Sequence, residues 1–511
     1  MDPHCLRHSE LPGASKLFQD FLYHPEKVAS FYRTEEKEKY PEARRAALVE
    51  ALRVQNPGNT LLDQLAQPGT QVVVTGQQVG LFSGPAYSVY KALTAVKLAR
   101  QIGAVPVFWL ATEDHDFAEI SQSWVFNAAH ETIGMRVSST IDPIAPAGTV
   151  PLIAPPVGEL RQALKEFPFG DEISTMVESC YHDGETMGSA FRKIMERLLG
   201  SYSLLVLDPL APEIRALAAP LLEKAAGMAD ELTTALLERN KQLEAAGYHA
   251  QVHVEPKTSL FFLLHDGKRI ALRRSNGEYV ARDLKLTAAD LCARSAELSP
   301  NALLRPVMQD YLMPTASYIG GPAELAYLAQ SQVLYEALLG RMPQPRSRAG
   351  FTILDPRSAK LMDRYELRIP MFFDGEQALK EKMAKKLIPP ALTASLESAS
   401  ARIGLELNTM AGQLRAFDPS LEKALARSSA KIRFQVSKIQ AKAAREAMRR
   451  DERASSDAAY LNGLLYPHKH LQERFYSILP FVAQHGLELI GYIYDHIELD
   501  CSDHQVLPYV Y

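Results

Sequence analysis

The chain has 511 residues, of which 47% are hydrophobic and 23% charged, and its formal net charge is −4. At about 150 residues per domain, this length predicts two to four domains, and the small negative charge disfavours a protein dedicated to nucleic acid. No stretch of the sequence approaches the roughly 20 apolar residues of a membrane span, and the first residues lack the pattern of a signal peptide. The four cysteines are scattered along the chain: Cys5, Cys180, Cys292 and Cys501. Without a C-x-x-C pair, they favour reduced thiols in a cytoplasmic protein over disulfides or a zinc site.

A strand, a glycine-rich loop and a helix are predicted in succession between residues 72 and 102. The apolar run Val72–Val74 stops at Thr75, as a buried strand does at the edge of a sheet. Gly84 and Pro85 suit the first positions of a helix, and the N–H groups and dipole of a helix start favour an anion. Other strand-to-helix connections are also rich in glycine, and this loop matches neither the dinucleotide nor the P-loop pattern, but we expect it to bind substrate. The candidate substrate-binding residues are Thr75, Gly76, Gln77, Gln78, Gly84, Tyr87 and Lys91.

A second strand is predicted at Val105–Ala111, and it leads into the acidic segment Glu113-Asp114-His115-Asp116. Open α/β sheets bind ligands at the carboxyl ends of their strands. Carboxylates around an imidazole suit a general base or a divalent cation, although an acidic cluster is also an ordinary helix start. We favour catalysis by His115 with Asp114 and Asp116, because neighbouring acids would raise the basicity of the imidazole. A metal site is disfavoured, because the sequence reveals no further ligands.

Further strands at residues 204–208 and 313–319 continue the β-loop-α-β pattern, which predicts a Rossmann-like parallel sheet. Two insertions interrupt this core, at 121–200 and 247–301. The second insertion contains strand-like runs on both sides of Asp266-Gly267, a dipeptide typical of a β-hairpin turn.

The second half of the core contributes more polar candidates. Arg305 and Gln309 precede the strand at 313–319, and Gly320-Gly321 follow it as a glycine turn before a second helix. Glu324, in the first turn of that helix, either binds substrate or supplies only the charge that a helix start favours. Two glycine turns at two strand ends would give one cleft two polar rims. The additional substrate-binding candidates are therefore Arg305, Gln309, Gly320, Gly321 and Glu324.

Heptad repeats predict an antiparallel coiled-coil hairpin between residues 392 and 451. Apolar residues recur every seven positions before and after a turn that contains Pro419: Leu396, Ile403 and Met410, then Leu425, Ile432 and Ile439. Each arm has only about three heptads, so a helical bundle is the alternative. Because one hairpin would hide these rows only partly, we expect a homodimer. The basic arm at 421–450 leaves a second function open, that of a coiled-coil scaffold or nucleic-acid-associated protein, but nucleic acid is disfavoured because no aromatic platform accompanies the charge.

The predicted fold class is α/β, with a Rossmann-like parallel-sheet core, two inserted connecting segments and a C-terminal antiparallel coiled coil. The segments are 1–120, the first half of the core; 121–200, the first insertion; 201–246, the core continued; 247–301, the second insertion; 302–375, the second half of the core; 376–460, the coiled-coil hairpin; and 461–511, a C-terminal segment that packs on the core.

At these motifs the chain resembles the bacillithiol biosynthesis BshC family, whose members are described as cysteine-adding ligases. The matching blocks are Thr75–Leu81, Gly84–Tyr87 with Lys91, Pro106–Trp109, Glu113–Phe117, Ser299–Asn301, Leu304–Pro306, Tyr318–Glu324 and Gln472–Arg474. The resemblance implies a Rossmann-type core with two insertions and a coiled coil used for dimerisation. It also implies that the enzyme joins L-cysteine to glucosaminyl-malate through an amide bond, in the last step to bacillithiol.

The resemblance extends to class I aminoacyl-tRNA synthetases and cysteine ligases, but both of their ATP-binding signatures, His-x-Gly-His and Lys-Met-Ser-Lys, are missing here. ATP or ADP is therefore a candidate cofactor without a motif. The family also implies a nucleotide pocket near the base of the coil, with Arg357, Ser358 and Asn462 as the nearest candidates. For amide formation, the loop with Lys91 would hold malate or an activated carboxyl group. His115 or a neighbouring acid would take the amine proton, and Glu324 could hold the ammonium of cysteine.

Overall fold

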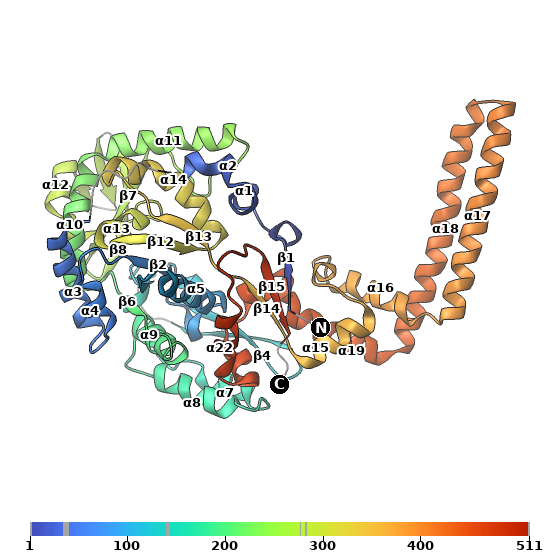
Figure 1. Ribbon diagram of the computed structural model, residues 1–511, viewed down its shortest axis with the longest axis horizontal. Helices are drawn as coiled ribbons and strands as arrows, with labels where there is room; N and C mark the ends of the chain where they lie inside the picture. Colours follow the sequence, from blue (N-terminus) through green and yellow to red (C-terminus); the bar gives the residue numbers. More distant parts are fainter. Residues whose placement is uncertain (1–2, 34–39, 139–143, 276, 282–283, 509–511) are drawn as a thin grey trace.

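A five-stranded parallel sheet forms the centre of the fold (Figure 1). The computed structural model describes residues 3–33, 40–138, 144–275, 277–281 and 284–508. In spatial order the strands are β13 (Gln344–Ser347), β12 (Thr315–Gly320), β2 (Val72–Gln77), β3 (Val105–Leu110) and β6 (Leu205–Leu207). All neighbouring pairs are parallel. This is the strand order of a Rossmann fold, with the reversal between β2 and β12, and it confirms the predicted fold class.

The sequence predicted four of these five strands and missed β13. That strand reads Gln-Pro-Arg-Ser and has no apolar alternation that would indicate a strand. It lies at the edge of the sheet, where a proline is tolerated because no further strand needs its missing N–H. Pairing with β12, and not the local sequence, therefore makes this segment a strand.

Helices cover both faces of the sheet, as expected for parallel strands with nearly continuous apolar runs. Successive side chains point to opposite faces, so Val72 and Val74 belong to one hydrophobic cluster and Val73 to another. Helix α5 (Tyr87–Ile102) covers the face of Val73. The helices in the opposite cluster include α10 (Pro212–Gly227), α13 (Arg305–Leu312) and α14 (Pro322–Leu338).

Each insertion forms a unit of its own beside the core. The first contains the hairpin β4 (Gln122–Phe126) and β5 (Thr132–Arg136), then α7 (Val157–Leu164), α8 (Gly170–Cys180) and α9 (Met187–Leu198). The second contains a five-stranded antiparallel sheet, in which β7 (Thr258–His265) pairs with β8 (Lys268–Ser275). Between these two strands, Asp266 and Gly267 have φ values of 49° and 69°. Two left-handed residues are what a type I′ turn needs, so the predicted hairpin is confirmed.

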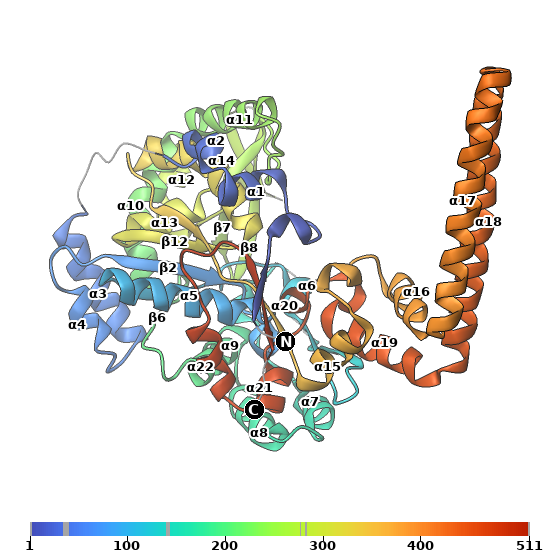
Figure 2. The same cartoon turned by 45° about the vertical axis from the view of Figure 1, so that its right-hand side comes forward.

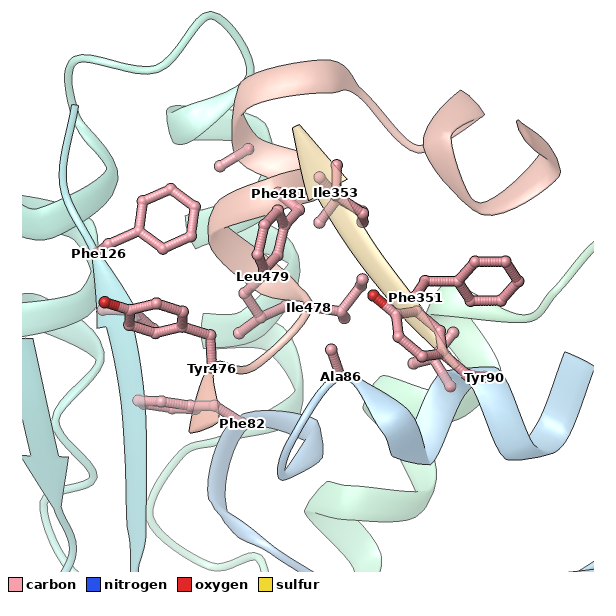
Figure 3. Packing of buried hydrophobic residues seen from close by; sticks show 14 of the residues in the cluster. Phe82, Ala86, Tyr90, Phe126, Phe351, Ile353, Tyr476, Ile478, Leu479 and Phe481 are labelled. Atoms are coloured by element: carbon pink, nitrogen blue, oxygen red, sulfur yellow. The ribbon is translucent and has the colours of Figure 1, made fainter. Parts of the chain in front are cut away.

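The two ends of the chain meet in a small sheet. Strand β15 (His504–Pro508) lies between β1 (His4–Leu6) and β14 (Phe351–Leu354). The C-terminal residues also complete the largest hydrophobic cluster. Figure 3 shows Tyr476 and Phe481 packed in one cluster with Phe82 and Tyr90, which lie at and just after the loop that follows β2. The C-terminal segment therefore supports the loop that the sequence marks as a binding loop.

The coiled-coil hairpin extends away from the rest of the molecule (Figures 1 and 2). It consists of α17 (Pro390–Phe417) and α18 (Ser420–Arg450), and α16 (Glu376–Leu387) packs against the base of α18. The antiparallel hairpin is confirmed. Several apolar side chains on it stay exposed: Leu392, Leu405, Met410, Phe417, Ile432, Phe434 and Ile439. Within the described ranges, no helix, these two included, is both long and apolar enough to cross a membrane.

Candidate active site

A polar cavity of about 240 Å³ lies at the carboxyl ends of β2, β3 and β12, where the strand order reverses. Open α/β sheets bind ligands at this position. The predicted residues that line it are Gly76, Gln77, Gln78, Tyr87, Arg305, Gln309, Gly321 and Glu324. The two glycine turns therefore form two rims of one cavity, as the sequence indicated.

Two other predicted binding residues hold the wall of the cavity together. The Thr75 hydroxyl donates to the carbonyl oxygen of Ile319 at 2.9 Å and so joins β2 to β12. The carbonyl oxygen of Gly320 accepts the backbone N–H of Arg348 at 2.9 Å. Neither Thr75 nor Gly320 lines the cavity, so the structure gives both a supporting position in its wall, and direct substrate binding by them stays a prediction.

Lys91 is buried behind this wall. Its Nζ donates to the carbonyl oxygen of Gly76, to Gln77 Oε1 at 3.1 Å and to Glu324 Oε2 at 2.7 Å. An ammonium has three N–H groups, so all of them are used within the protein. The prediction that Lys91 itself binds an anionic substrate group is corrected: Lys91 fixes the rim at Gly76 and Gln77 against Glu324.

Glu324 lines the cavity as a firmly held carboxylate. Besides Lys91, it accepts the hydroxyl of Tyr318 and the backbone N–H of Gly321, each at 2.8 Å. Burial alone would raise the pKa of Glu324, but Lys91 and the two other donors keep it below its ordinary value. The rim formed by the second glycine turn therefore holds a fixed carboxylate, whose charge the buried Lys91 ammonium balances.

The loop between β2 and α5 has an unusual backbone. Phe82, Ser83 and Gly84 have φ values of 53°, 72° and 63°, a region that only glycine enters readily. At the start of the helix, the N–H of Ala86 donates to the carbonyl oxygen of Tyr476 at 2.7 Å. At least one of the N–H groups that were predicted to bind an anion is therefore already hydrogen-bonded within the protein. This helix start has fewer free N–H groups for a ligand than the sequence indicated.

His115 lies beside the cavity and is not among the residues that line it. Arg269 donates to His115 Nδ1 at 3.0 Å, and Asp114 Oδ1 is 3.6 Å from the same nitrogen. Burial and Arg269 lower the pKa of His115 more than Asp114 and Asp116 raise it. The predicted gain in basicity was therefore wrong, because Arg269 comes from β8 of the second insertion.

Asp114 and Asp116, the other two predicted catalytic residues, have clear structural partners. Asp114 accepts the side-chain amide of Gln78 and, at 3.0 Å, a guanidinium N–H of Arg269. Asp116 Oδ1 accepts the N–H of Glu119 at 3.0 Å and so caps α6 (Phe117–Ile120). The structure thus favours the alternative in which Asp116 caps the start of a helix. Asp114 holds the side chain of Gln78 by a hydrogen bond.

Glu119 is the carboxylate of this segment that lines the cavity. Glu119 is an exposed residue, and partial desolvation in the cavity, followed by the nearby charges of Asp114 and Asp116, raises its pKa. A carboxylate with a raised pKa in a cleft suits a general base. Sequence analysis missed Glu119 because the acidic cluster three to six residues earlier gave the stronger pattern.

Three arginines from distant parts of the chain give the cavity a positive wall: Arg305, Arg348 and Arg474. Arg348 is neutralised by Glu473, with which it makes two hydrogen bonds. Arg305 donates to the hydroxyl of Tyr327 at 3.1 Å, and Arg474 lies 5.5 Å from the ring centre of Tyr87. Among the described residues, no carboxylate forms an ion pair with Arg305 or Arg474, so two positive charges are available to an anionic ligand.

Two glutamines that line the cavity, Gln78 and Gln309, each have a side-chain oxygen without a hydrogen-bond partner among the described residues. Both oxygens, Oε1 in each case, are buried. A buried acceptor without a partner costs about 1–3 kcal/mol.

A second cavity, of about 250 Å³, adjoins the first. The residues that line both are Gln77, Gln78, Glu119 and Arg474. Trp124, His470 and Phe475 line the second cavity, together with Gly84 from the predicted binding loop. The Phe475 ring stacks on Trp124 and on His470, with ring centres 5.0 Å and 5.6 Å apart. We call the two cavities the main lobe and the second lobe.

The predicted nucleotide-binding residues lie outside both lobes. Arg357 and Ser358 are on α15 (Pro356–Tyr365), and Asn462 is on α19 (Glu452–Leu465). Ser358 Oγ and Asn462 Oδ1 are buried without a hydrogen-bond partner among the described residues, while the Arg357 guanidinium lies 3.8 Å from the ring centre of Tyr460. Among all the residues that the structure describes, no three His, Cys, Asp or Glu side chains come together as a metal site.

A Rossmann-like sheet with a polar, two-lobed cavity at its switch point defines a protein that binds small charged molecules. Comparison with known proteins gives the family. Residues 1–348 match the N-terminal Rossmann-like domain of bacillithiol biosynthesis BshC, and residues 351–509 match its C-terminal coiled-coil domain. The chain belongs to the BshC family.

Three relatives, each named "Putative cysteine ligase BshC", illustrate the similarity. The protein of Solibacter usitatus is 53% identical over 98% of this chain and 99% of its own length. That of Koribacter versatilis is 36% identical over 99% and 100%, and that of Chlorobaculum tepidum is 33% identical over 88% and 86%. The resemblance inferred from the sequence motifs is thus confirmed.

Proposed function

We propose that the chain is a ligase that joins the carboxyl group of L-cysteine to the amine of glucosaminyl-malate. The observation that supports this best is that two cavities meet at Glu119 and Arg474. A condensation needs two substrates held so that their reacting groups meet. Family membership further supports the ligase over a scaffold or nucleic-acid-associated protein.

We assign cysteine to the main lobe. Its ammonium would face Glu324 and Gln309, which line this lobe, and its carboxyl group would face Arg305. We assign glucosaminyl-malate to the second lobe, with its malate carboxylates near Arg474. Sugar rings commonly pack on aromatic faces, and the stack that ends in His470 offers one.

Glu119 is positioned for the proton transfer that amide formation requires. The attacking amine must lose a proton as its nitrogen bonds to the carbonyl carbon of activated cysteine. The Glu119 carboxylate lines both lobes and can accept that proton. Asp114 and His115 act indirectly in this scheme, because Asp114 orients Gln78 and His115 contacts Arg269.

Activation of the cysteine carboxylate needs an energy donor, for which we propose ATP. The resemblance to BshC also suggests a nucleotide near Arg357, Ser358 and Asn462, where two buried oxygens without partners, on Ser358 and Asn462, fit hydrogen-bond donors of such a ligand. Because these residues lie outside both lobes, this would be a separate nucleotide site and not the place where cysteine is activated. We also propose a cytoplasmic location, where both substrates and ATP would be available.

Replacing Arg474 by alanine is expected to weaken the binding of glucosaminyl-malate. Loss of a hydrogen bond to a charged group costs about 1.5–3 kcal/mol, which corresponds to roughly a 10- to 150-fold higher Kd. Titration calorimetry with the full chain measures this directly. As a control, Arg453→Ala removes an exposed arginine of α19 outside both lobes and should leave Kd unchanged. Equal affinity of wild type and Arg474→Ala would remove Arg474 from the acceptor site.

We further propose that two chains dimerise through the coiled-coil hairpin. Ile432 and Ile439 belong to one heptad row, yet they are 39% and 57% exposed, so a second chain could cover them. Replacing both by aspartate should give monomers in light scattering, because two buried charges would disrupt such an interface. The matched change at Lys431 and Lys438, the exposed positions just before them, should keep the dimer. A dimer mass that survives Ile432→Asp with Ile439→Asp would place the interface elsewhere.

A further inference from the structure

Two cysteines from opposite ends of the chain lie side by side. Cys5 is on β1, and Cys501 is in the segment that leads into β15. Their Sγ atoms are 3.9 Å apart, although 496 positions separate the two residues in the sequence. Both are free thiols; Cys5 is exposed and Cys501 half-buried. The pairing of β1 with β15, in which Cys5 is opposite Gln505, brings them together.

This geometry allows a disulfide with little movement. An S–S bond is about 2.0 Å long, so the two sulfur atoms must approach by roughly 2 Å, which side-chain rotations can supply. The pairing of β1 with β15, which begins three residues after Cys501, already holds the two segments side by side, so closure costs little backbone order. The other two cysteines lie elsewhere in the fold: Cys180 on α8 and Cys292 on α12 (Ala288–Ala293).

We infer that Cys5 and Cys501 form a reversible modification site for low-molecular-weight disulfides. The inference does not depend on the proposed ligase activity. In the first step, the Cys501 thiolate attacks one sulfur of a disulfide R–S–S–R, which forms a mixed disulfide and releases one R–S⁻. The Cys5 thiol then loses its proton to water and attacks Cys501 Sγ, which releases the second R–S⁻. The protein dithiol is oxidised by two electrons, and the small disulfide is reduced to two thiols.

The surroundings of Cys5 suit its role in the second step, the attack on the mixed disulfide at Cys501. Partial desolvation beside Cys501, together with the charges of Cys501, Glu498 and Asp503, raises the pKa of the Cys5 thiol to about 11. Its thiolate is therefore rare at neutral pH, and attack on a small disulfide from solvent would be slow. Once Cys501 carries a mixed disulfide, the short distance between the two Sγ atoms compensates for the small fraction of Cys5 thiolate.

Closing this bond would tie the ends of the chain together at a sheet that supports the active site. Strand β15 pairs with β14, and the N–H of Phe351 on β14 donates to Glu473 at 3.0 Å. Glu473 in turn holds Arg348 in the wall of the main lobe. The disulfide would therefore stiffen the small sheet that is linked to the cavity wall through Phe351, Glu473 and Arg348, and such intracellular disulfides are usually redox-responsive.

The test uses the full chain and cystine as the probe. The protein is incubated with cystine at about pH 8.5, near the ordinary pKa of a cysteine thiol, free thiols are blocked, and peptides are mapped without reduction. We expect a peptide pair linked through Cys5 and Cys501, with Cys180 and Cys292 blocked as free thiols. We also expect the thermal midpoint to rise by a few degrees, on the order of 5 °C, and to return after treatment with dithiothreitol. Separate adducts on Cys5 and Cys501, with no linked pair, would overturn the inference.

Two single variants sharpen the result. In Cys5→Ser, cystine should leave a stable cysteinyl adduct on Cys501, and the thermal midpoint should not rise. Cys292→Ser, a half-buried cysteine in another part of the fold, should behave as the wild type. A rise of the thermal midpoint in Cys5→Ser equal to that of the wild type would contradict a bond between the two residues.

Discussion

Replacing Glu119 by glutamine is expected to lower turnover by about 10²–10⁴-fold, the usual contribution of a positioned general base. Glutamine keeps the size and hydrogen-bonding reach of the side chain but accepts no proton, so substrate binding should change little. Glu119 faces both lobes, whereas His115 lines neither. His115→Asn should therefore cost less turnover than Glu119→Gln, and steady-state kinetics of the two variants measure the difference.

The pH dependence gives an independent check on the same residue. Because partial desolvation and the charges of Asp114 and Asp116 raise the pKa of Glu119, the base becomes active only above the ordinary range of glutamate, near pH 4.3. We expect kcat/KM of the wild type to rise with pH through this raised pKa, and Glu119→Gln to lose that limb. Glu131→Gln, which changes an exposed carboxylate between β4 and β5 and outside both lobes, should match the wild type. If Glu119→Gln turns over slowly but its kcat/KM still rises with pH as in the wild type, another residue is the base.

Replacing Glu473 by glutamine is expected to lower the free energy of unfolding by about 3–5 kcal/mol, because it leaves the buried Arg348 without its counter-charge. The side chains of Arg348 and Glu473 are 5% and 4% exposed, and Glu473 also accepts the N–H of Phe351 at 3.0 Å. Chemical denaturation measures the loss. The exposed ion pair of Lys386 and Glu366 is the matched control, and Glu366→Gln should cost less than about 1 kcal/mol.

The same pair should make stability depend on pH at the acid end. Burial alone would raise the pKa of Glu473, but Arg348 and its other donors lower it from 4.5 to about 2. A carboxyl group whose pKa falls on folding stabilises the protein above its unfolded pKa, and this contribution is lost as the pH falls. We expect the difference between wild type and Glu473→Gln to be full above about pH 4.5 and to shrink towards pH 2. If the difference in the free energy of unfolding between wild type and Glu473→Gln is the same near pH 2 as above pH 4.5, the charge of Glu473 is not its cause.

The sequence was sufficient for the core and for about half of the residues that line the main lobe. Strands β2, β3, β6 and β12 have local apolar runs, and glycine turns mark the ends of β2 and β12. In a parallel sheet the carboxyl ends of these strands lie at the same edge. The closeness of Gln77 and Glu324 can therefore be predicted without knowing how the insertions fold.

The errors concern residues whose environment comes from far along the chain. Local acids predicted a more basic His115, but Arg269, 154 positions away, lowers its pKa. Lys91 looked free beside a glycine-rich loop, but Glu324, 233 positions away, binds it. Arg474 gave no local signal as a binding residue, because only the return of the C-terminal segment brings it to the cavity. Such pairings depend on tertiary packing that periodicity does not encode.

The most direct test of the proposed ligation is metabolite analysis of a bacterium that makes bacillithiol and whose own BshC gene has been deleted. This measurement does not depend on which donor activates cysteine. Expression of the wild-type chain should restore bacillithiol and remove accumulated glucosaminyl-malate, while Glu119→Gln, present at the same level, should leave the precursor high. Persistent glucosaminyl-malate with abundant, folded wild-type chain would contradict the proposed reaction, and full restoration by Glu119→Gln would contradict the proposed base.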